Sequence, residues 1–318
     1  MCIRDRSGAS LAHHRYLREK HSLTNLQLLQ GDLREVGSLG RTFDLVVCSG
    51  VLHHMADPAE GLAALREVMK ADGAMTLMVY GATGRTGIYM LQEVFRRLQL
   101  DQSEESVGVV RQVLANLPNS HMVKSYVSSA GELRHDAAIV DTFLHRQDRA
   151  FTVPQLLEWI EGAGLQFQAW NQNQYYYPDA LVKEPALSLV RRLSEPEQWA
   201  CVENLLCVAG THGLVVRQAK TAVAVDLDAP DWMSWRPRLV PAASLTREGS
   251  AVLLEVENVR FALSPAEQGL VQGINGRATI GEIMNQPCFS QFPKREVEGF
   301  VRQAFDHFRK IGAAMFQK

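Results

Sequence analysis

The stretch that decides the fold is residues 43–80, which reads FDLVVCSGVLHHMADPAEGLAALREVMKADGAMTLMVY. It begins with the apolar run 43–48, which is rich in β-branched residues, as is typical of a strand buried on both faces of a sheet. Residues 74–79 form a second run of the same kind. Two such runs joined by a helical segment predict one βαβ unit, with parallel strands and a right-handed crossover.

The segment between the two runs carries the signals of a helix. Asp57 can cap its first turn, Pro58 suits the first helical position, and Glu60 completes a capping box. Asp72 and Gly73 are expected to end the helix before the second strand begins. The helix would therefore fill most of the connection between the two strands.

The loops after the two strands are the expected place of a ligand. In sheets built from such units, ligands bind in the crevice outside the carboxyl ends of the strands. Here these ends lead into residues 48–54 and residues 80–85. The first segment holds Ser49 and Gly50, whose small side chains let a ligand approach the main chain closely. Two adjacent histidines come next.

The order of strand, double histidine, Asp-Pro helix start and Gly-led strand in residues 43–81 resembles the class I S-adenosylmethionine-dependent methyltransferases. In that family it corresponds to the fourth strand, the next helix and the fifth strand. The resemblance implies an α/β fold, here an incomplete Rossmann-like, mostly parallel sheet with helices on both faces. It also implies S-adenosyl-L-methionine as the cofactor and methyl transfer to an acceptor. A doubly wound α/β domain of another kind is the alternative.

The beginning of the chain departs from the pattern of that family. A class I domain opens with a strand and a Gly-rich loop for the methionine end of the cofactor, and an acidic residue ends its second strand. We find neither ahead of Asp32, where Gly8 and Gly31 are the only glycines. Residues 1–6 show no pattern that joins them to the helix expected from residue 7, and we interpret them as an artefact of sequencing or gene calling. The resemblance thus implies an amino-terminally truncated methyltransferase; a natural protein without the loop is the alternative.

The candidates for cofactor binding follow two predicted strands, residues 25–30, where apolar and polar residues alternate, and residues 43–48. For Asp32, the resemblance implies that the carboxylate accepts a hydrogen bond from the adenine amino group, and that the main chain of Leu33 meets the ring nitrogen. The alternative is that Asp32 is an ordinary helix cap. Ser49, Gly50 and Val51 would line the cofactor through their main-chain atoms.

Three histidines and one aspartate are candidates for the reacting end of the site. His53 would bound the sulfur end of the cofactor, and His54 would remove a proton from the acceptor, because an imidazole titrates near neutrality. His145 and Asp148 lie in a predicted lid and suit acceptor binding or base catalysis. The alternatives are histidine rings bonded to the backbone and a solvated loop. No further ligands indicate a metal site.

The chain divides into several regions by composition. Residues 1–219 form the methyltransferase-like domain, within which residues 7–85 are the remnant of the cofactor side and residues 86–164 are a helical insertion that serves as lid and substrate side. Residues 220–246, with several prolines and two tryptophans, read as a linker. Residues 247–318 are predicted to form a small α+β domain.

The order of elements in the last region resembles a winged-helix domain. A hairpin is predicted over residues 251–263, capping boxes at Ser264 and Thr279 each open a helix, and a third helix precedes a returning strand. The charges in residues 294–298 are balanced between lysine, arginine and glutamate, so we do not expect nucleic-acid binding. Contact with a protein or peptide is the more common use of such an appended domain.

Composition excludes several other classes of protein. The formal net charge of the 318 residues is −2, which gives no general attraction for nucleic acid. No apolar run approaches the roughly 20 residues of a membrane span. The five cysteines are scattered without metal-ligand spacing, so we expect a reducing cytoplasm and no zinc site.

Two rival functions stay open at this point. The first is a non-catalytic, methyltransferase-like binding module that has lost its cofactor loop. The second is a nicotinamide-dependent α/β enzyme, but the Gly-rich loop that it needs is equally absent, and the Tyr16 to Lys20 spacing falls too early in the chain to face a nicotinamide. The acceptor, whether a small molecule or a protein, is not identified. Methyl transfer asks for little acid–base chemistry, because the site mainly aligns the reactants.

Overall fold

The structure of the chain is a computed structural model whose described part comprises residues 1–180, 182–207, 210–221, 225–257 and 259–318. The chain divides into two compact units. The first unit contains residues 1–169 and 207–222, and the second contains residues 170–206 and 223–318.

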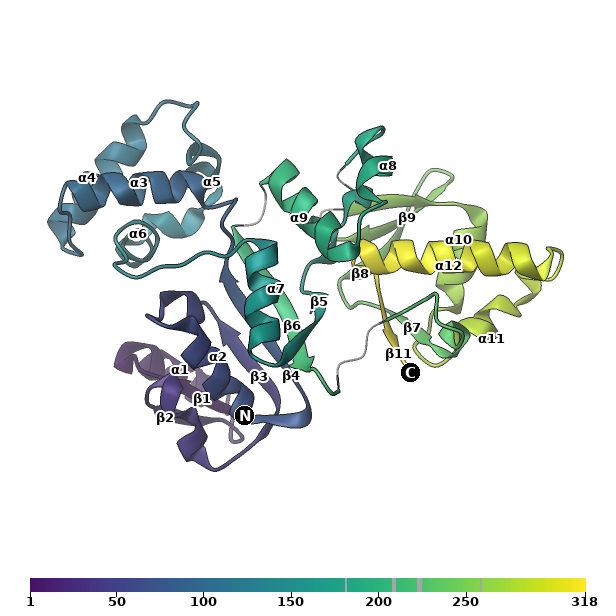
Figure 1. Cartoon of the computed structure of the whole chain (residues 1–318), viewed down its shortest axis with the longest axis horizontal. Coiled ribbons are helices and arrows are strands. Elements are labelled where there is room, and N and C mark those ends of the chain that lie inside the picture. Colours follow the sequence, from purple (N-terminus) through teal and green to yellow (C-terminus); the bar gives the residue numbers. More distant parts are fainter. Residues whose placement is uncertain (181, 208–209, 222–224, 258) are drawn as a thin grey trace. The chain divides into compact units, whose positions relative to one another are not determined.

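A four-stranded sheet forms the centre of the first unit (Figure 1). Its strands stand in the order β3 (Phe43–Ser49), β4 (Met69–Tyr80), β6 (Thr211–Gln218) and β5 (Leu165–Trp170). β3 and β4 pair in parallel, whereas β6 runs antiparallel to β4. The parallel pairing predicted for the two apolar runs is confirmed.

The helix between β3 and β4 begins where it was predicted to begin. After the short 3₁₀ turn η2 (Leu52–His54), α2 (Pro58–Glu67) starts behind Asp57, whose carboxylate accepts a hydrogen bond from the amide of Ala59 at 2.8 Å. Among the described hydrogen bonds, Glu60 makes none back to Asp57. The predicted cap is therefore present, but the second half of the capping box is not formed.

The helix stop predicted at residues 72–73 is wrong, because β4 already begins at Met69. The register between the two strands shifts near the start of β3. A Cβ added to Gly73 would lie 3.0 Å from the main-chain oxygens of Phe43 and Asp44. The glycine is thus required for the close approach of two backbones at a bulge, and it does not end a helix.

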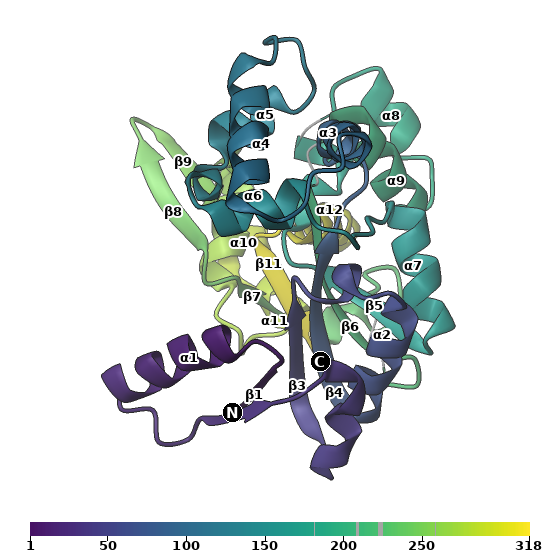
Figure 2. The same cartoon turned by 90° about the vertical axis from the view of Figure 1, so that its left-hand side faces the viewer.

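A separate two-stranded sheet lies at the start of the unit. Its parallel strands are β1 (Cys2–Asp5) and β2 (Gln27–Gln30), joined by α1 (Gly8–Lys20), and Figure 2 shows α1 and β1 in purple. The interpretation of residues 1–6 as unconnected to the rest of the chain is wrong for the fold. Main-chain pairing holds this four-residue strand, and such pairing needs no alternation of polar and apolar residues.

β3 is an edge strand of the larger sheet. Its partner within the described residues is β4, and its two faces differ in burial. Val46 and Cys48 are buried, whereas the side chains on the other face, Leu45 and Val47, are 59% and 65% exposed. The expectation of a strand buried on both faces is therefore wrong, because the face that bears Leu45 and Val47 lines a cavity.

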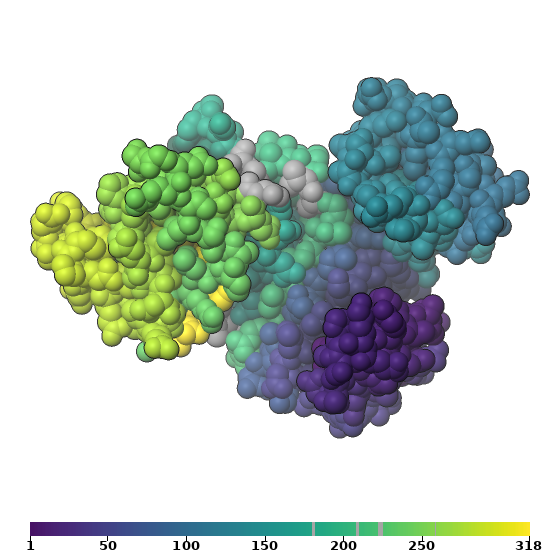
Figure 3. Space-filling model, turned by 180° about the vertical axis from the view of Figure 1, so that it is seen from behind, coloured from purple at the N-terminus to yellow at the C-terminus, as the bar shows by residue number. Residues whose placement is uncertain are grey.

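A lobe of helices follows β4. It comprises α3 (Thr86–Arg97), α4 (Glu104–Asn116), α5 (Lys124–Ser129), the 3₁₀ turn η3 (Gly131–Arg134) and α6 (Asp136–Phe143). The lobe has a hydrophobic core of its own, in which Phe95 and Phe143 meet edge to face at 6.2 Å. Figure 3 shows it in blue, apart from the purple amino-terminal residues. The predicted helical insertion after the fifth strand of the family pattern is present.

The chain returns from this lobe to the sheet at Phe151. That residue forms an isolated parallel bridge with Gly81, just beyond the end of β4. α7 (Val153–Gly162) then opens with a complete capping box of Thr152 and Gln155 and leads into β5.

The second unit contains the remaining elements. These are the 3₁₀ turns η4 (Asn173–Tyr175), η5 (Pro178–Ala180), η6 (Trp232–Ser234) and η7 (Pro287–Phe289); the helices α8 (Ala186–Val190), α9 (Glu195–Leu206), α10 (Pro265–Gly273), α11 (Ile280–Met284) and α12 (Lys294–Lys310); and the strands β7 (Arg236–Leu239), β8 (Ala243–Glu248), β9 (Ala251–Val256), β10 (Val259–Leu263) and β11 (Ala314–Gln317). β8, β9 and β10 form one antiparallel sheet, and β11 pairs with β7. The predicted hairpin, capping boxes and returning strand are confirmed, while the winged-helix interpretation stays a prediction.

The division into regions differs from the predicted one. Residues 170–206 group with the second unit, where the amide of Asn173 donates to the main-chain oxygen of Arg309 at 2.9 Å and Arg309 donates to the hydroxyl of Tyr177 at 2.9 Å. Such contacts join residues more than a hundred positions apart, which local patterns do not reveal. The segment predicted as a linker supplies β7 and part of β8. Its tryptophans are buried, as expected of a segment that packs by them.

Across the parts of the chain that the structure describes, no helix is long and apolar enough to cross a membrane.

Candidate active site

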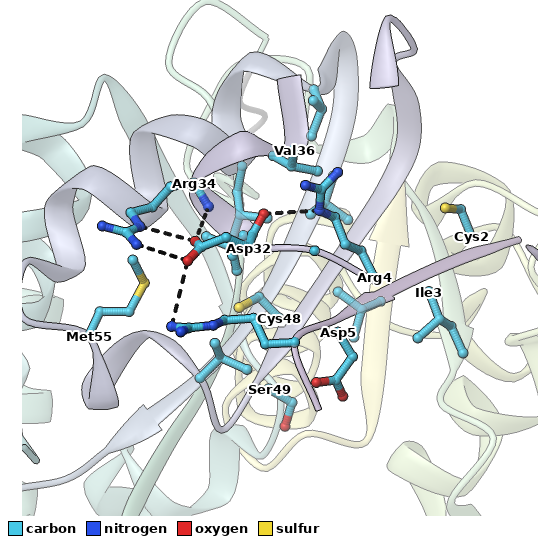
Figure 4. A pocket seen from close by; sticks show the side chains of 18 of the residues that line it. Cys2, Ile3, Arg4, Asp5, Asp32, Arg34, Val36, Cys48, Ser49 and Met55 are labelled. Atoms are coloured by element: carbon cyan, nitrogen blue, oxygen red, sulfur yellow. Dashed lines mark hydrogen bonds and ion pairs between the residues drawn. The ribbon is translucent and has the colours of Figure 1, made fainter. Parts of the chain in front are cut away.

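A cavity of about 840 Å³ lies in the first unit, beside the carboxyl ends of β2 and β3 (Figure 4). This volume falls within the range of small-molecule sites, which is roughly 300–1,000 Å³. Its walls come from the two-stranded sheet, from the turn after β2, from β3 and from the start of α2. The lining includes Asp5, Asp32, Leu33, Arg34, Val36, Leu45, Val47, Cys48, Ser49, Val51, His54, Met55, Glu60 and Gln147.

Asp32 lies in the wall of this cavity and also caps the 3₁₀ turn η1 (Leu33–Leu39). Its carboxylate accepts hydrogen bonds from the main-chain amide, Nε and Nη2 of Arg34 at 2.9, 3.0 and 2.9 Å. These bonds hold the pKa of the carboxyl well below its usual range. Asp32 thus caps the 3₁₀ turn and also lines the cavity. A ligand that forms a hydrogen bond with its carboxylate must displace Arg34, whose side chain is 50% exposed.

The residue after Asp32 offers a main-chain donor to the cavity. Leu33 is the first residue of η1, so its amide has no acceptor within the turn. Its side chain and those of Val36 and Met55 give the same region apolar walls. An acid, a main-chain donor and apolar surfaces are what a flat heteroaromatic ring with an exocyclic amino group requires.

Two of the three residues predicted to contact the cofactor in the turn after β3 line the cavity. Ser49 and Val51 line the cavity, whereas Gly50 is not part of the lining. Gly50 has a φ of +75°, and its amide donates to the main-chain oxygen of Met78 at 3.1 Å. The glycine is therefore explained by this left-handed backbone, and the predicted contact with a ligand is not needed to account for it.

β1 ends on an acidic residue, Asp5, whose place at the end of a strand was not predicted from the sequence. Asp5 lines the cavity, where its carboxylate accepts hydrogen bonds from the amide of Ser7 at 2.8 Å and the hydroxyl of Ser10 at 2.6 Å. The expectation that no acid ends a strand ahead of Asp32 is therefore wrong. Both oxygens of Asp5 serve the start of α1 in this structure.

His53 lies behind the cavity wall. Its side chain is buried, with 1% of the residue exposed, and its ring stacks on Tyr80 with 3.6 Å between centroids. Burial lowers the pKa of the imidazole to about 3. Among the described residues, neither ring nitrogen has a hydrogen-bond partner. The predicted contact of His53 with a cofactor stays a prediction, and the ring does not line the cavity.

His54 lines the cavity, and a polar group lies close to each nitrogen of its ring. Its Nδ1 lies 3.2 Å from the main-chain oxygen of Gln147, and its Nε2 lies 3.4 Å from Oδ1 of Asp141. Its ring lies 4.0 Å from that of His145. Burial, together with the charge that His145 can carry, lowers the pKa of His54, so the ring is neutral at pH 7.

His145 and Asp148 stand in the segment that leaves the helical lobe. The Nδ1 of His145 accepts a hydrogen bond from the amide of Gln147 at 3.1 Å, so its proton is on Nε2 when the ring is neutral. Asp148 is buried, with 1% of its side chain exposed. The structure thus brings His145 next to His54, but it places Asp148 out of reach of an acceptor.

The partners of Asp148 come from the start of α3. The carboxylate accepts hydrogen bonds from the hydroxyl of Tyr89 at 2.6 Å, Nε2 of Gln92 at 2.9 Å and Nη2 of Arg85 at 3.1 Å. Sequence reasoning missed these three residues. Their spacing of four and three positions, which places them on one helix face, was the available signal.

Comparison with known proteins agrees with this geometry. Residues 2–75 match the model of a methyltransferase domain family, and this range holds most of the cavity lining. The structure of PKMT2 from Rickettsia typhi superposes over 100% of this chain and 66% of its own length, with a TM-score of 0.65 and 9% sequence identity. The chain therefore has the fold of a class I methyltransferase, and residues 2–75 match that family's domain.

Two further similarities extend this result. The Rickettsia typhi PKMT2 in complex with AdoHcy gives a TM-score of 0.64 at 11% identity, again over 100% of this chain and 66% of that one. An uncharacterized protein of Synechococcus, syc1184_c, is 32% identical over 157 residues, which are 48% of this chain and 38% of that protein. The chain therefore spans well under half the length of this curated relative and about two thirds of each PKMT2 chain.

The arrangement of the polar groups near the cavity bears on whether a metal ion could bind there. Within the residues that the structure describes, no group of three histidine, cysteine or acidic side chains is placed to hold a metal ion. The histidines His53, His54 and His145 instead form a chain of ring contacts with spacings of 4.3 and 4.0 Å. This chain ends on the stack of His53 with Tyr80.

Proposed function

We propose that the cavity binds S-adenosylmethionine and that the protein transfers the methyl group to an acceptor presented beside His54. The observation that carries the proposal is the cavity at the carboxyl ends of β2 and β3, with Asp32 and Leu33 in one wall. The methyltransferase fold and the AdoHcy complex of a structural neighbour support it.

The residues of the cavity fit the adenosine part of this cofactor. The carboxylate of Asp32 would accept from the adenine amino group once Arg34 has moved away, and the amide of Leu33 would donate to a ring nitrogen. The apolar side chains of Val36 and Met55 would cover the ring. The Gly-rich loop that the family uses for the methionine part is not found in the sequence, so we expect this chain to hold that part weakly.

When bound, the cofactor supplies an activated sulfonium, and the residues of the chain are left with alignment and proton removal. His54 is suited to the second task. Its Nδ1 faces the main-chain oxygen of Gln147, which places the proton there and leaves the lone pair on Nε2. A proton taken up at Nε2 would be stabilised by Asp141, whose Oδ1 lies 3.4 Å away.

The acceptor is proposed only as a class. It must carry an oxygen, nitrogen or carbon that loses a proton, and it is a small molecule or a protein side chain. We propose that transfer by this chain as given is impaired, because the loop for the methionine part is not found.

The alternative is a non-catalytic, methyltransferase-like binding module. One observation favours it: Arg34 already occupies both carboxylate oxygens of Asp32. In such a module this ion pair would be permanent, and the cavity would stay closed to adenine. Binding of S-adenosylhomocysteine by the unmodified chain separates the two functions, because the closed cavity of the module would not bind it.

The experiment is calorimetric titration of S-adenosylhomocysteine into matched variants. Asp32→Ala should weaken binding by about tenfold or more, which corresponds to about 1.4 kcal/mol, whereas Arg34→Ala should leave binding unchanged or strengthen it. Asp44→Asn is the control, because the side chain of this aspartate is 85% exposed and pairs with Lys70 of the neighbouring strand, away from the ring site. Equal affinity of the Asp32→Ala and control variants would contradict the proposed ring site.

A further inference from the structure

A buried ion pair fastens the segment that carries His145 to the start of α3. Nη2 of Arg85 donates to Oδ2 of Asp148 at 3.1 Å, and the two side chains are 5% and 1% exposed. Tyr89 and Gln92 complete the surroundings of the carboxylate. Two opposite charges are thus buried together, and removal of either would leave the other unpaired in the interior, where an unpaired charge is strongly unfavourable.

The same segment is tied to both strand ends by its main chain. The amide of Arg149 donates to the oxygen of His53 at 2.9 Å, and the amide of Phe151 donates to the oxygen of Tyr80 at 2.9 Å. The amide of Ala82 donates back to the oxygen of Phe151 at 2.9 Å. Residues 145–151 therefore bridge the end of β3 and the end of β4.

Arg85 also organises the rings below this segment. Its Cζ lies 3.5 Å from the ring centroid of Tyr80, while the ring of His53 lies 3.6 Å from the same centroid. Two groups this close cannot share one face, so Tyr80 is held between them. The hydroxyl of Tyr80 donates to Oδ2 of Asp141 at 2.9 Å, and Asp141 is also the carboxylate beside His54.

We propose that Arg85 and Asp148 are a positioning pair that holds residues 145–149 against the strand ends and thereby fixes the imidazole of His54 in the cavity wall. Gln147, whose main-chain oxygen meets Nδ1 of His54, lines the cavity together with that ring. Release of the segment would remove this contact and the contact with His145 at once. The position of His54 follows from the structure, and only its use in proton removal rests on the proposed function.

The test is an NMR titration of the histidine Cε1–H signals in the full chain, with His54 assigned through a His54→Gln variant. The charged and titratable groups that face His54 are His53, His145, Tyr80, Asp141 and Asp148. In Asp148→Asn, loss of a negative charge alone would lower the pKa of His54 further. Release of the segment exposes the ring to water and would instead raise the pKa toward the ordinary value of about 6.5. We expect the rise.

Two variants accompany this measurement. Tyr89→Phe removes one hydrogen bond to Asp148 and keeps both charges, so it should fold and should raise the pKa of His54 by a smaller amount. Asp136→Asn is the control, because this aspartate is exposed in the same helical lobe and pairs with Arg111, and it should leave the pKa unchanged. If Asp148→Asn does not fold, the pKa of His54 in Tyr89→Phe tests the positioning role instead.

A fall or no change of the His54 pKa in Asp148→Asn, or no change in Tyr89→Phe when the first variant is unfolded, would overturn the positioning role. The readout needs neither cofactor nor acceptor. Failure of the positioning pair is thus distinguishable from failure of the proposed methyl transfer, which the calorimetric titration tests separately.

Discussion

At the scale of single residues, the most unusual group is the imidazole of His53. It is buried, it stacks on Tyr80, and neither nitrogen has a hydrogen-bond partner among the described residues. A buried polar group without partners is unfavourable, and a buried charge is more so. The ring is therefore kept neutral by its surroundings, which makes the stability of the fold depend on pH.

The sign of this dependence follows from the lowered pKa. The folded pKa of His53 is about 3, and an unfolded histidine titrates at about 6.5, so the unfolded state binds more protons between these values. The contribution is fully present above about pH 6.5 and is lost as the pH falls toward 3. Between pH 6.5 and 5 the loss from this one residue should be about 2 kcal/mol.

Replacement of His53 tests this expectation. His53→Phe keeps an aromatic ring against Tyr80 and removes the titrating nitrogens, so the variant should lose less stability than the parent between pH 7 and 5. Urea denaturation at the two pH values measures the difference. The exposed His13 supplies the control His13→Phe, which should change nothing. An unchanged pH dependence in His53→Phe would show that other groups carry it.

Residues of the candidate site could be predicted only where a local pattern marks them. Asp32 and His54 stand directly after predicted strands, and the structure places both in one cavity wall. Arg85 was missed because its partner Asp148 is 63 positions away. Asp148 itself was noticed as an acid in a lid, but its burial depends on that partner and was not visible in the sequence.

At the scale of elements, Gly87 marks a close contact between α3 and the main chain of residues 122–123. A Cβ on Gly87 in α3 would lie 2.5 Å from the main-chain nitrogen of Val123 and 2.7 Å from the carbonyl carbon of Met122. Backbone atoms cannot move aside as a flexible side chain can. The first turn of α3 therefore needs a residue without a Cβ at this contact.

A matched pair of alanine variants tests this contact. Gly87→Ala should destabilise the protein by about 1–3 kcal/mol through overpacking. Gly108→Ala in α4, where a Cβ would meet nothing within 4 Å, should stabilise it by up to about 1 kcal/mol through helix propensity. Thermal denaturation followed by circular dichroism compares the two. A stable Gly87→Ala protein would mean that α3 does not pack on residues 122–123 as described.

Elements were predictable where their signal is contained in a few adjacent residues. The hairpin of β9 and β10 and the caps of α2, α10 and α11 were predicted from the sequence, because alternation and capping are local. β7 contains Pro237 and two arginines, so it resembles a linker, and it becomes a strand only because β11 pairs with it. The exposure of one face of β3 likewise depends on which elements stand beside it.

At the scale of the whole molecule, the comparisons concern different parts of the chain. The methyltransferase domain model covers residues 2–75, and the similarity to the PKMT2 structures covers both units by fold alone. The second unit, with its own core around Trp232, Trp235 and α12, has no proposed chemistry beyond a contact with a protein or peptide. The proposed binding of cofactor therefore depends on the first unit and its cavity.

The measurement that tests this account most directly is calorimetric titration of the chain with S-adenosylhomocysteine, adenosine and methionine in parallel. Because the cavity offers a ring site and the loop for the methionine part is not found, we predict that S-adenosylhomocysteine and adenosine bind with similar dissociation constants, both weaker than about 1 µM. Methionine should show no binding. Binding of S-adenosylhomocysteine in the absence of adenosine binding, or binding of neither, would contradict the claim that the wall around Asp32 and Leu33 is a ring site.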